Sequence, residues 1–208
     1  MSGERREIAN PAAALAVLAR ARTDEIVVLS ESTRQDWPPL SNRPELDISI
    51  TGSMSKASSF GLGVALARPD IQVWVLDSDG ALLMNLGSLV TIARAKPTNL
   101  LHVVYDNAAY DTTGGQPTPG AGMVDFCALA RGAGYPSACA YDELASFESD
   151  LPSILAGPRP ALVVLTVASI GRRPTVAGMT PMRGAFESIR DYLARREGPP
   201  TLSPAGQL

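Results

Sequence analysis

Runs of consecutive apolar residues are the strongest pattern in this sequence. They occur at residues 25–30, 71–76, 100–105 and 161–168, with a shorter run near 137–140. Continuous apolar runs of this length are typical of parallel strands that are buried on both faces. The segments around them predict helices at 11–22, 54–67, 81–95, 123–133, 142–155 and 182–196. Strands that alternate with helices indicate an α/β fold: a single doubly wound, mostly parallel sheet with helices on both faces.

Two stretches fall outside this alternation. Residues 31–51 predict an irregular connection, and so long a connection inside a compact domain is more often functional than idle. The other is the basic loop Gly171-Arg172-Arg173-Pro174, which is either solvated or steers an anionic substrate or an acidic partner. We expect residues 1–23 to form an N-terminal helix or extension, 24–170 the main domain, and 171–208 a loop, a helix and a Pro-rich tail.

Composition excludes several classes of protein. The 208 residues are 45% hydrophobic and 19% charged, as in ordinary globular domains. The net charge of −3, without a cluster of Lys and Arg, indicates no binding to nucleic acid. Residues 1–24 lack the apolar segment of a signal peptide and no run is long enough to span a membrane, so we expect a cytoplasmic protein that binds no membrane. Cys127 and Cys139 lack zinc-ligand spacing and predict two buried thiols.

Acidic turns follow two of the predicted strands. Asp79-Gly80 comes after the run 71–76, Asp106-Asn107 comes after the run 100–105, and Asn107 lies 28 residues beyond Asp79. Either turn alone is better explained as a helix cap or an ordinary turn. Because parallel strands joined by a helix end at one edge of the sheet, the pair predicts a binding site there, next to the Gly-rich loop 108–122.

Oxygen donors at these turns favour a hard cation and a phosphate. Asp79, the amide oxygen of Asn107 and the Ala109 carbonyl could bind Mg²⁺, with two phosphate oxygens and a water completing an octahedron. Gly80 lets the backbone approach the phosphate, and the N–H groups of Ala81 and Leu82 open the next helix towards it. The pattern therefore predicts a diphosphate ligand bound through Mg²⁺.

These motifs resemble those of thiamine-diphosphate-dependent enzymes. Asp79-Gly80 followed by Asn107 is similar to the signature G-D-G-x(about 26)-N-N, and Thr51-Gly52-Ser53-Met54-Ser55 is similar to the family's G-S-M-G segment. More narrowly, residues 82–93 and 106–118 resemble sulfopyruvate decarboxylase β-type subunits and the C-terminal half of phosphonopyruvate decarboxylases. The resemblance covers about residues 24–168, one diphosphate-binding (PP) domain of the thiamine-diphosphate-binding fold.

The resemblance implies a role for each matching position. Asp79, Asn107 and the Ala109 carbonyl are the Mg²⁺ ligands, while Gly80, Ala81 and the backbone N–H of Thr112 hold the diphosphate. The carbonyl of Gly52 accepts a hydrogen bond from the 4′-amino group of the cofactor. The cofactor-binding set is Gly52, Ser53, Met54, Ser78, Asp79, Gly80, Ala81, Asn107, Ala109, Tyr110, Asp111 and Thr112. The catalytic set is Gly52, Met54, Thr113 and Gln116.

Some of these positions have a second interpretation. Met54 either wedges the bound cofactor into its bent form or simply packs in the core. Tyr110, Thr113 and Gln116 lie in the loop over the diphosphate, within reach of a substrate or merely solvated. His102 lies among apolar residues and is expected to be a core or interface histidine.

Four positions depart from the family pattern. Ser78 and Ser55 stand where the signatures have glycine, Ala81 offers no hydroxyl to the phosphate, and Asp106 replaces the first asparagine of N-N. Each change leaves the implied metal ligands in place.

The family also needs a glutamate against the aminopyrimidine ring, from a second, pyrimidine-binding (Pyr) module. Residues 1–24 are too short for such a module, and Glu31 lies on the diphosphate-binding half. We therefore expect a partner Pyr-domain subunit that supplies the glutamate, in a hetero-oligomer of α2β2 or larger composition. The implied activity is decarboxylation of a small anionic 2-oxo acid. The alternatives are a carboligase subunit similar to acetolactate synthase, a non-catalytic cofactor-binding subunit, and a domain that binds another phosphate ligand.

Overall fold

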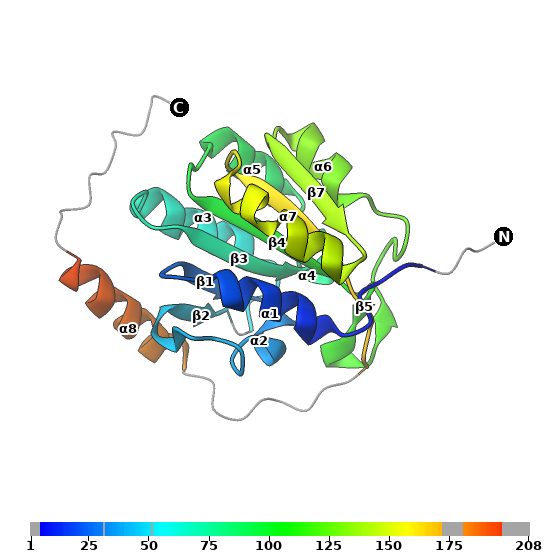
Figure 1. The fold of residues 1–208 in the computed structure, drawn as a ribbon, viewed down its shortest axis with the longest axis horizontal. Helices are drawn as coiled ribbons and strands as arrows, with labels where there is room; N and C mark the ends of the chain where they lie inside the picture. The colour runs from blue at the N-terminus through cyan, green and yellow to red at the C-terminus, as the bar shows by residue number, and fades with distance from the viewer. Residues whose placement is uncertain (1–4, 31, 51, 172–180, 197–208) are drawn as a thin grey trace.

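The protein folds around one six-stranded parallel sheet (Figure 1). The computed structural model describes residues 5–30, 32–50, 52–171 and 181–196. The strand order is β2-β1-β3-β4-β8-β7, and every neighbouring pair is parallel. The strands are β1 (Ile26–Leu29), β2 (Asp47–Ser49), β3 (Val73–Ser78), β4 (Leu100–Asp106), β7 (Ser137–Tyr141) and β8 (Ala161–Thr166).

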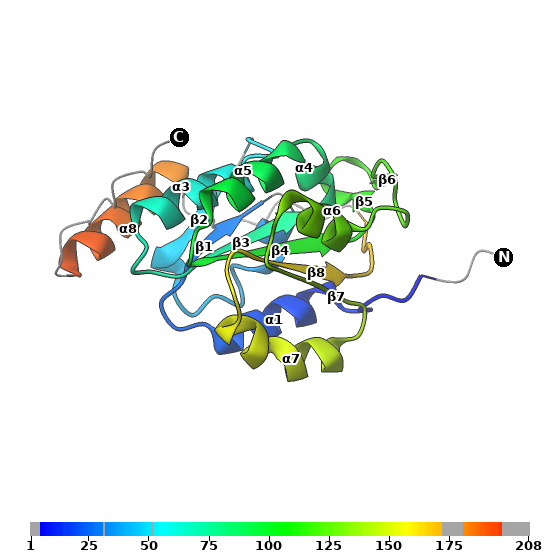
Figure 2. The same ribbon diagram turned by 90° about the horizontal axis from the view of Figure 1, so that it is seen from above.

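Helices cover both faces of the sheet, as Figure 2 shows. One face carries α3 (Ala57–Ala67), α4 (Asp79–Leu83), α5 (Gly87–Ala95) and α6 (Phe126–Ala133). The other face carries α1 (Pro11–Ala21) and α7 (Leu144–Ala156). A further helix, α8 (Met182–Arg195), packs beside the edge strand β2. The predicted doubly wound α/β fold is therefore confirmed.

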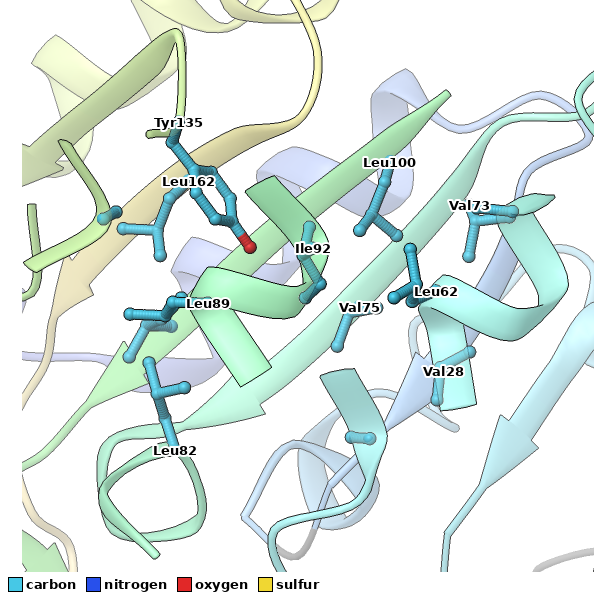
Figure 3. Packing of buried hydrophobic residues seen from close by; sticks show 14 of the residues in the cluster. Val28, Leu62, Val73, Val75, Leu82, Leu89, Ile92, Leu100, Tyr135 and Leu162 are labelled. Atoms are coloured by element: carbon cyan, nitrogen blue, oxygen red, sulfur yellow. The ribbon is translucent and has the colours of Figure 1, made fainter. Parts of the chain in front are cut away.

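Alternate residues of the central strands supply two separate cores. Val73 and Val75 of β3 join the cluster under α3 and α5, whereas Trp74 and Leu76 join the cluster under α1 and α7. Figure 3 shows the first cluster, in which Leu62 of α3 lies close to Val75. Because both faces of β3 are buried, its sequence is apolar at consecutive positions rather than at alternate ones.

A glycine allows α3 to approach the sheet closely. A Cβ atom added at Gly61 would lie 2.2 Å from the Cγ2 atom of Val75, well inside van der Waals contact. Gly63, two residues further along the same helix, has nothing within 4 Å of its added Cβ. Of these two glycines, Gly61 allows α3 to pack against the sheet, and Gly63 faces away from it.

Residues 32–50 contain more regular structure than the sequence indicates, so the prediction of an irregular connection is wrong for this described part of 31–51. This segment contains α2 (Thr33–Asp36), the 3-10 helix η1 (Pro44–Leu46) and β2. The strand escapes detection because it has three residues, of which only Ile48 is fully buried. Asp47 of the same strand forms an ion pair with Arg22 at 2.8 Å. A charged residue at this position interrupts the apolar pattern by which a buried strand is predicted.

Two other predicted elements need correction. The single helix expected over 81–95 is two helices, α4 and α5, with a break at 84–86. The loop 108–122 contains a small antiparallel hairpin, β5 (Ala109–Tyr110) and β6 (Gln116–Pro117), around the 3-10 helix η2 (Asp111–Thr113). We call residues 109–118 the hairpin segment.

Both cysteines are free thiols, as predicted, but the prediction that both are buried holds for Cys127 alone. Cys127 is buried and Cys139 is half-buried. Burial raises the pKa of the Cys127 thiol to about 11 and also raises the pKa of Cys139. None of the helices in the described ranges has the length and apolar character needed to cross a membrane. The Arg172-Arg173 pair lies outside the described residues.

Candidate functional site

The two acidic segments meet at the carboxyl edge of the sheet, although Asp79-Gly80 is the beginning of α4 and not the separate turn that the sequence predicts. β3 and β4 are adjacent and in register, with Ser78 opposite Tyr105, so Asp79 and Asp106 follow at neighbouring strand ends. In Figure 1, α4 and the hairpin segment lie together at this end of the sheet. The expectation that both turns share one edge is confirmed, and this edge is where open α/β sheets bind ligands.

Asp79 is a buried carboxylate with one unpartnered oxygen. Its side chain accepts a hydrogen bond from the Thr118 hydroxyl at 2.9 Å through Oδ2. Its Oδ1 atom is buried and has no hydrogen-bond partner among the described residues. Burial, together with the negative charge of Asp106, raises the pKa of Asp79 to about 7. A cation beside Oδ1 would supply the missing compensation, so this position fits a metal ion.

Asn107 is buried at the end of β4 with its amide held on both sides. Its Nδ2 donates to Asp111 Oδ2 at 2.9 Å, and its Oδ1 accepts from the backbone N–H of Ala109 at 3.2 Å. An amide oxygen has two lone pairs, so Oδ1 can still bind a cation. The side-chain donors that remain open at this edge are thus the Asp79 carboxylate and the Asn107 amide oxygen, while Arg5 pairs with the Asp106 carboxylate, and Asn107 and Ser169 engage the Asp111 carboxylate. This mixed oxygen set suits Mg²⁺ rather than zinc, and the described residues contain no group of three His, Cys, Asp or Glu side chains placed to hold a metal.

Asp111 links Asn107 to the strand beyond it. Its Oδ1 atom accepts a hydrogen bond from the Ser169 hydroxyl at 2.6 Å, while Oδ2 accepts from Asn107. The carboxylate is buried and engaged at both oxygens. Asp111 belongs to the predicted cofactor-binding set. Its side chain joins η2 to Asn107 after β4 and to Ser169 after β8.

Gly80 accommodates the hairpin segment. A Cβ added at Gly80 would lie 2.4 Å from Tyr110 Cε1 and 3.2 Å from Thr118 Cγ2. The side of Gly80 that a side chain would occupy is therefore filled by protein. Position 80 must therefore be glycine for Tyr110 and Thr118 to pack against it. This requirement is separate from the predicted contact of the Gly80 backbone with a phosphate.

The other expected diphosphate positions surround these groups. Ser78 is buried at the end of β3, and Ala81 is buried in α4, a helix of only five residues. Thr112 is half-buried in η2 and lines a small cavity together with Asn107 and Asp111.

The segment that includes Gly52 and Met54 precedes α3. The predicted helix start at residue 54 is wrong, since α3 begins at Ala57 and Met54 lies in a turn. Gly52 and Ser55 have φ angles of +70° and +76°, Ser53 is exposed, and Met54 is half-buried. The Ser55 carbonyl accepts a hydrogen bond from Asn85 Nδ2 at 3.2 Å, which ties the segment to the connection between α4 and α5.

Thr113 and Gln116 are exposed on the hairpin segment. The Thr113 hydroxyl donates to the Tyr110 carbonyl at 3.4 Å, and Gln116 Nε2 donates to the Thr113 carbonyl at 3.3 Å. Both side chains therefore contact the hairpin itself, and both remain accessible to a ligand above it.

Sequence reasoning missed three contacts at this edge. Thr118 holds Asp79, Ser169 holds Asp111, and Arg5 forms an ion pair with Asp106 at 2.7 Å. The spacing along the chain provides no signal for these contacts, because each joins segments that meet only after folding. A weak signal exists for Thr118 alone, as the last residue of the motif at 106–118.

His102 is a core histidine, as predicted. It is fully buried, with its ring nitrogens 3.3 Å from Asp77 Oδ2 and 3.4 Å from the Tyr135 hydroxyl. Asp77 therefore belongs to the strand and its core, while Asp79 belongs to the site.

A parallel sheet with buried acid and amide side chains at its carboxyl edge is typical of α/β domains that bind their ligand beyond the strand ends. Residues 35–165 match the model of the thiamine pyrophosphate enzyme, C-terminal TPP binding domain. The chain belongs to this family, whose cofactor is also named thiamine diphosphate.

Similar proteins include named decarboxylases. The chain is 42% identical over 118 residues to phosphonopyruvate decarboxylase of Streptomyces viridochromogenes, covering 57% of this chain and 29% of that protein. It is 34% identical over 152 residues to sulfopyruvate decarboxylase subunit beta of Methanococcus maripaludis, covering 69% of this chain and 81% of that subunit. The matches span less than a third of the two phosphonopyruvate decarboxylases found, at 29% and 31% of their lengths.

A solved structure agrees in fold. The thiamine diphosphate-dependent 4-hydroxybenzoylformate decarboxylase of Rhodococcus jostii superposes with a TM-score of 0.64 at 22% identity, over 80% of this chain and 35% of that one. At this identity the match supports the fold and carries no assignment of substrate.

Proposed function

We propose that this chain is the diphosphate- and Mg²⁺-binding subunit of a thiamine-diphosphate-dependent 2-oxo acid decarboxylase. The observation that carries the proposal is the buried, unpartnered Oδ1 atom of Asp79, in a domain of the thiamine pyrophosphate enzyme family. The same carboxylate begins the Asp79-Gly80 turn that resembles the cofactor signature.

In this proposal the chain anchors the cofactor at two places. Asp79, Asn107 and the Ala109 carbonyl bind Mg²⁺, and the backbone N–H groups of Gly80, Ala81 and Thr112 hold the diphosphate. In the segment before α3, the Gly52 carbonyl accepts the 4′-amino group, and Met54 supports the bend of the cofactor. Bound thiamine diphosphate supplies a nucleophilic carbon and an electron sink for the loss of CO₂ from a 2-oxo acid.

The protein's own contribution is binding, orientation and electrostatics. Mg²⁺ at Asp79 offsets the repulsion between this carboxylate, Asp106 and the phosphates, and the Arg5–Asp106 ion pair reduces it further. Tyr110, Thr113 and Gln116 lie on the hairpin segment, where Thr113 and Gln116 are accessible to a substrate.

We further propose a partner subunit that carries the pyrimidine-binding module and its activating glutamate. The support is the name of the Methanococcus maripaludis relative, a subunit beta that this chain matches over 81% of its length. The names of the relatives also support a small 2-oxo acid with a second anionic group, such as a sulfonate or a phosphonate, as substrate. The assembly is expected to be α2β2 or larger.

Calorimetry with Asp79→Asn tests the metal assignment. Loss of the charged ligand is expected to weaken Mg²⁺-dependent binding of thiamine diphosphate by at least about 100-fold, since an uncompensated buried charge costs about 3–5 kcal/mol. The matched control is Asp142→Asn, because Asp142 is half-buried and follows β7 at the same edge of the sheet. Equal binding by both variants would reject Asp79 as a ligand. Isolation of the partner and assay of CO₂ release from sulfopyruvate and phosphonopyruvate then test the activity.

A further inference from the structure

The hairpin segment contacts both proposed side-chain ligands. Thr118 lies at its end and donates a hydrogen bond to Asp79. Asp111 lies near its beginning, at the start of η2, and accepts one from Asn107. Thr118 and Asp111 are themselves buried, with exposed fractions of 4% and 6%. The two ligands come from different strands, so this one segment joins them.

Thr118 selects one of the two oxygens of Asp79. A carboxylate has two equivalent oxygens and can present either one to a cation. The hydroxyl of Thr118 occupies Oδ2 at 2.9 Å, and Oδ1 is the atom left without a partner among the described residues. Thr118 is held in turn by the backbone, because its N–H donates to the Ala108 carbonyl at 3.0 Å. The free oxygen is thus determined by the hairpin segment.

Asp111 determines the orientation of the Asn107 amide. The two ends of an amide differ, since only the oxygen can bind a cation. An ionised carboxylate accepts hydrogen bonds and donates none, so Asp111 Oδ2 requires the Nδ2 end of Asn107. The oxygen is then directed to the opposite side, where the Ala109 N–H also contacts it at 3.2 Å. Ser169 holds Asp111 from the chain after β8, at 2.6 Å.

We propose that Thr118 and Asp111 are positioning residues of the metal site, which hold Asp79 and Asn107 so that the metal-binding oxygens are presented before the metal arrives. This inference rests on the proposed function. Its consequence is that metal affinity depends on Thr118 and Asp111, two residues that do not bind the metal themselves. They act through their hydrogen bonds to Asp79 and Asn107. Groups that orient metal ligands in this way typically contribute about 10- to 100-fold to metal affinity.

Two substitutions at Thr118 separate positioning from packing. Thr118→Val removes the hydroxyl and keeps the Cγ2 methyl group that faces Gly80, whereas Thr118→Ser keeps the hydroxyl and removes the methyl group. Mn²⁺ binding to the 208-residue chain, followed by electron paramagnetic resonance in the presence of thiamine diphosphate, measures the metal directly and needs no turnover. We expect Thr118→Val to weaken Mn²⁺ binding by about 10- to 100-fold and Thr118→Ser to stay within about threefold of wild type.

Asp111→Asn provides the second arm of the experiment. An amide at position 111 can donate as well as accept, so it no longer enforces one orientation of Asn107. We expect Mn²⁺ binding to weaken by about tenfold or more, with thermal unfolding of the metal-free chain measured alongside. Thr91→Val is the matched control for Thr118→Val, since Thr91 is exposed on α5 and, among the described residues, its hydroxyl donates to the Gly87 carbonyl of the same helix.

The outcomes distinguish this inference from the proposed function. If wild type binds Mn²⁺ with the cofactor and both Thr118→Val and Asp111→Asn bind it equally well, the positioning inference is overturned and the proposed function stands. The inference is also overturned if Thr118→Ser loses as much affinity as Thr118→Val, because the methyl contact is then what matters. Absence of Mn²⁺ binding by wild type in the presence of the proposed partner subunit overturns the proposed function and this inference together.

Discussion

Ser55 and Ser78 both stand where the family signatures have glycine, but their backbones differ. Ser55 has a φ angle of +76°, in the left-handed region that residues with a side chain rarely adopt. Ser78 has φ −120° and ψ 155°, an ordinary extended conformation that any residue adopts. A glycine in place of Ser55 would therefore relieve backbone strain, whereas the backbone conformation of Ser78 does not call for a glycine.

Substitution of each serine by glycine should change stability in opposite directions. Ser55→Gly is expected to raise the free energy of unfolding by about 1 kcal/mol, because a left-handed conformation costs a side-chain-bearing residue about 1–2 kcal/mol. Ser78→Gly is expected to lower it by about 0.5–1 kcal/mol through the greater freedom of glycine in the unfolded chain. Urea denaturation of the metal-free chain measures both changes, and two changes of the same sign would contradict the assignment of strain to Ser55.

At the scale of elements, α3 depends on Gly61 for its distance from β3. Gly61→Ala places a methyl group 2.2 Å from Val75 Cγ2, which must push the helix away from the sheet. We expect this overpacking to lower the free energy of unfolding by about 1–3 kcal/mol. Gly63→Ala is the control on the same helix, where open space and better helix propensity should raise stability by about 0.5–1 kcal/mol. Thermal and urea unfolding of the two variants check the prediction, which a destabilised Gly63→Ala or a neutral Gly61→Ala would contradict.

Elements with long apolar runs could be predicted from the sequence, and elements defined by tertiary contacts could not. β3 and β4 are buried on both faces, so their composition alone identifies them. β2 has three residues and owes its place to pairing with β1, which no local pattern records. The break between α4 and α5 is also invisible locally, since Asn85 leaves the helix to contact the Ser55 carbonyl, 30 residues earlier.

The same limit applies to the site. Asp79 and Asn107 could be placed at one edge of the sheet because each follows directly after an apolar strand. The partners that hold them could not, because Thr118 and Asp79 are 39 positions apart, and Ser169 and Asp111 are 58 apart. Residues that orient a ligand are therefore the part of a site that sequence patterns reveal least.

For the whole molecule, the proposed side-chain ligands follow directly after the two central strands of the sheet, Asp79 after β3 and Asn107 after β4. Binding at these strands should stabilise the entire domain, because both cores are built on them. With thiamine diphosphate and Mg²⁺ each well above saturation, at about 100 times the dissociation constant, the gain is about 2.7 kcal/mol. For a chain of this size we expect a rise in Tm of about 5–10 °C. Differential scanning fluorimetry should show little change in Tm with thiamine diphosphate alone or with Mg²⁺ alone. If thiamine diphosphate raised Tm by the same amount when EDTA removes Mg²⁺, the metal would be excluded from the site.

The two thiols also affect how this protein can be studied. A thiol with a raised pKa is almost entirely protonated at neutral pH, and the protonated form does not attack maleimides. Cys127 is buried as well, so the described part of the chain offers a nearly silent background for covalent labelling. A single cysteine introduced at Met123, which is 86% exposed just beyond the hairpin segment, could then carry a fluorophore. Its emission, with the native cysteines kept in place, would then test whether a partner subunit binds near this position.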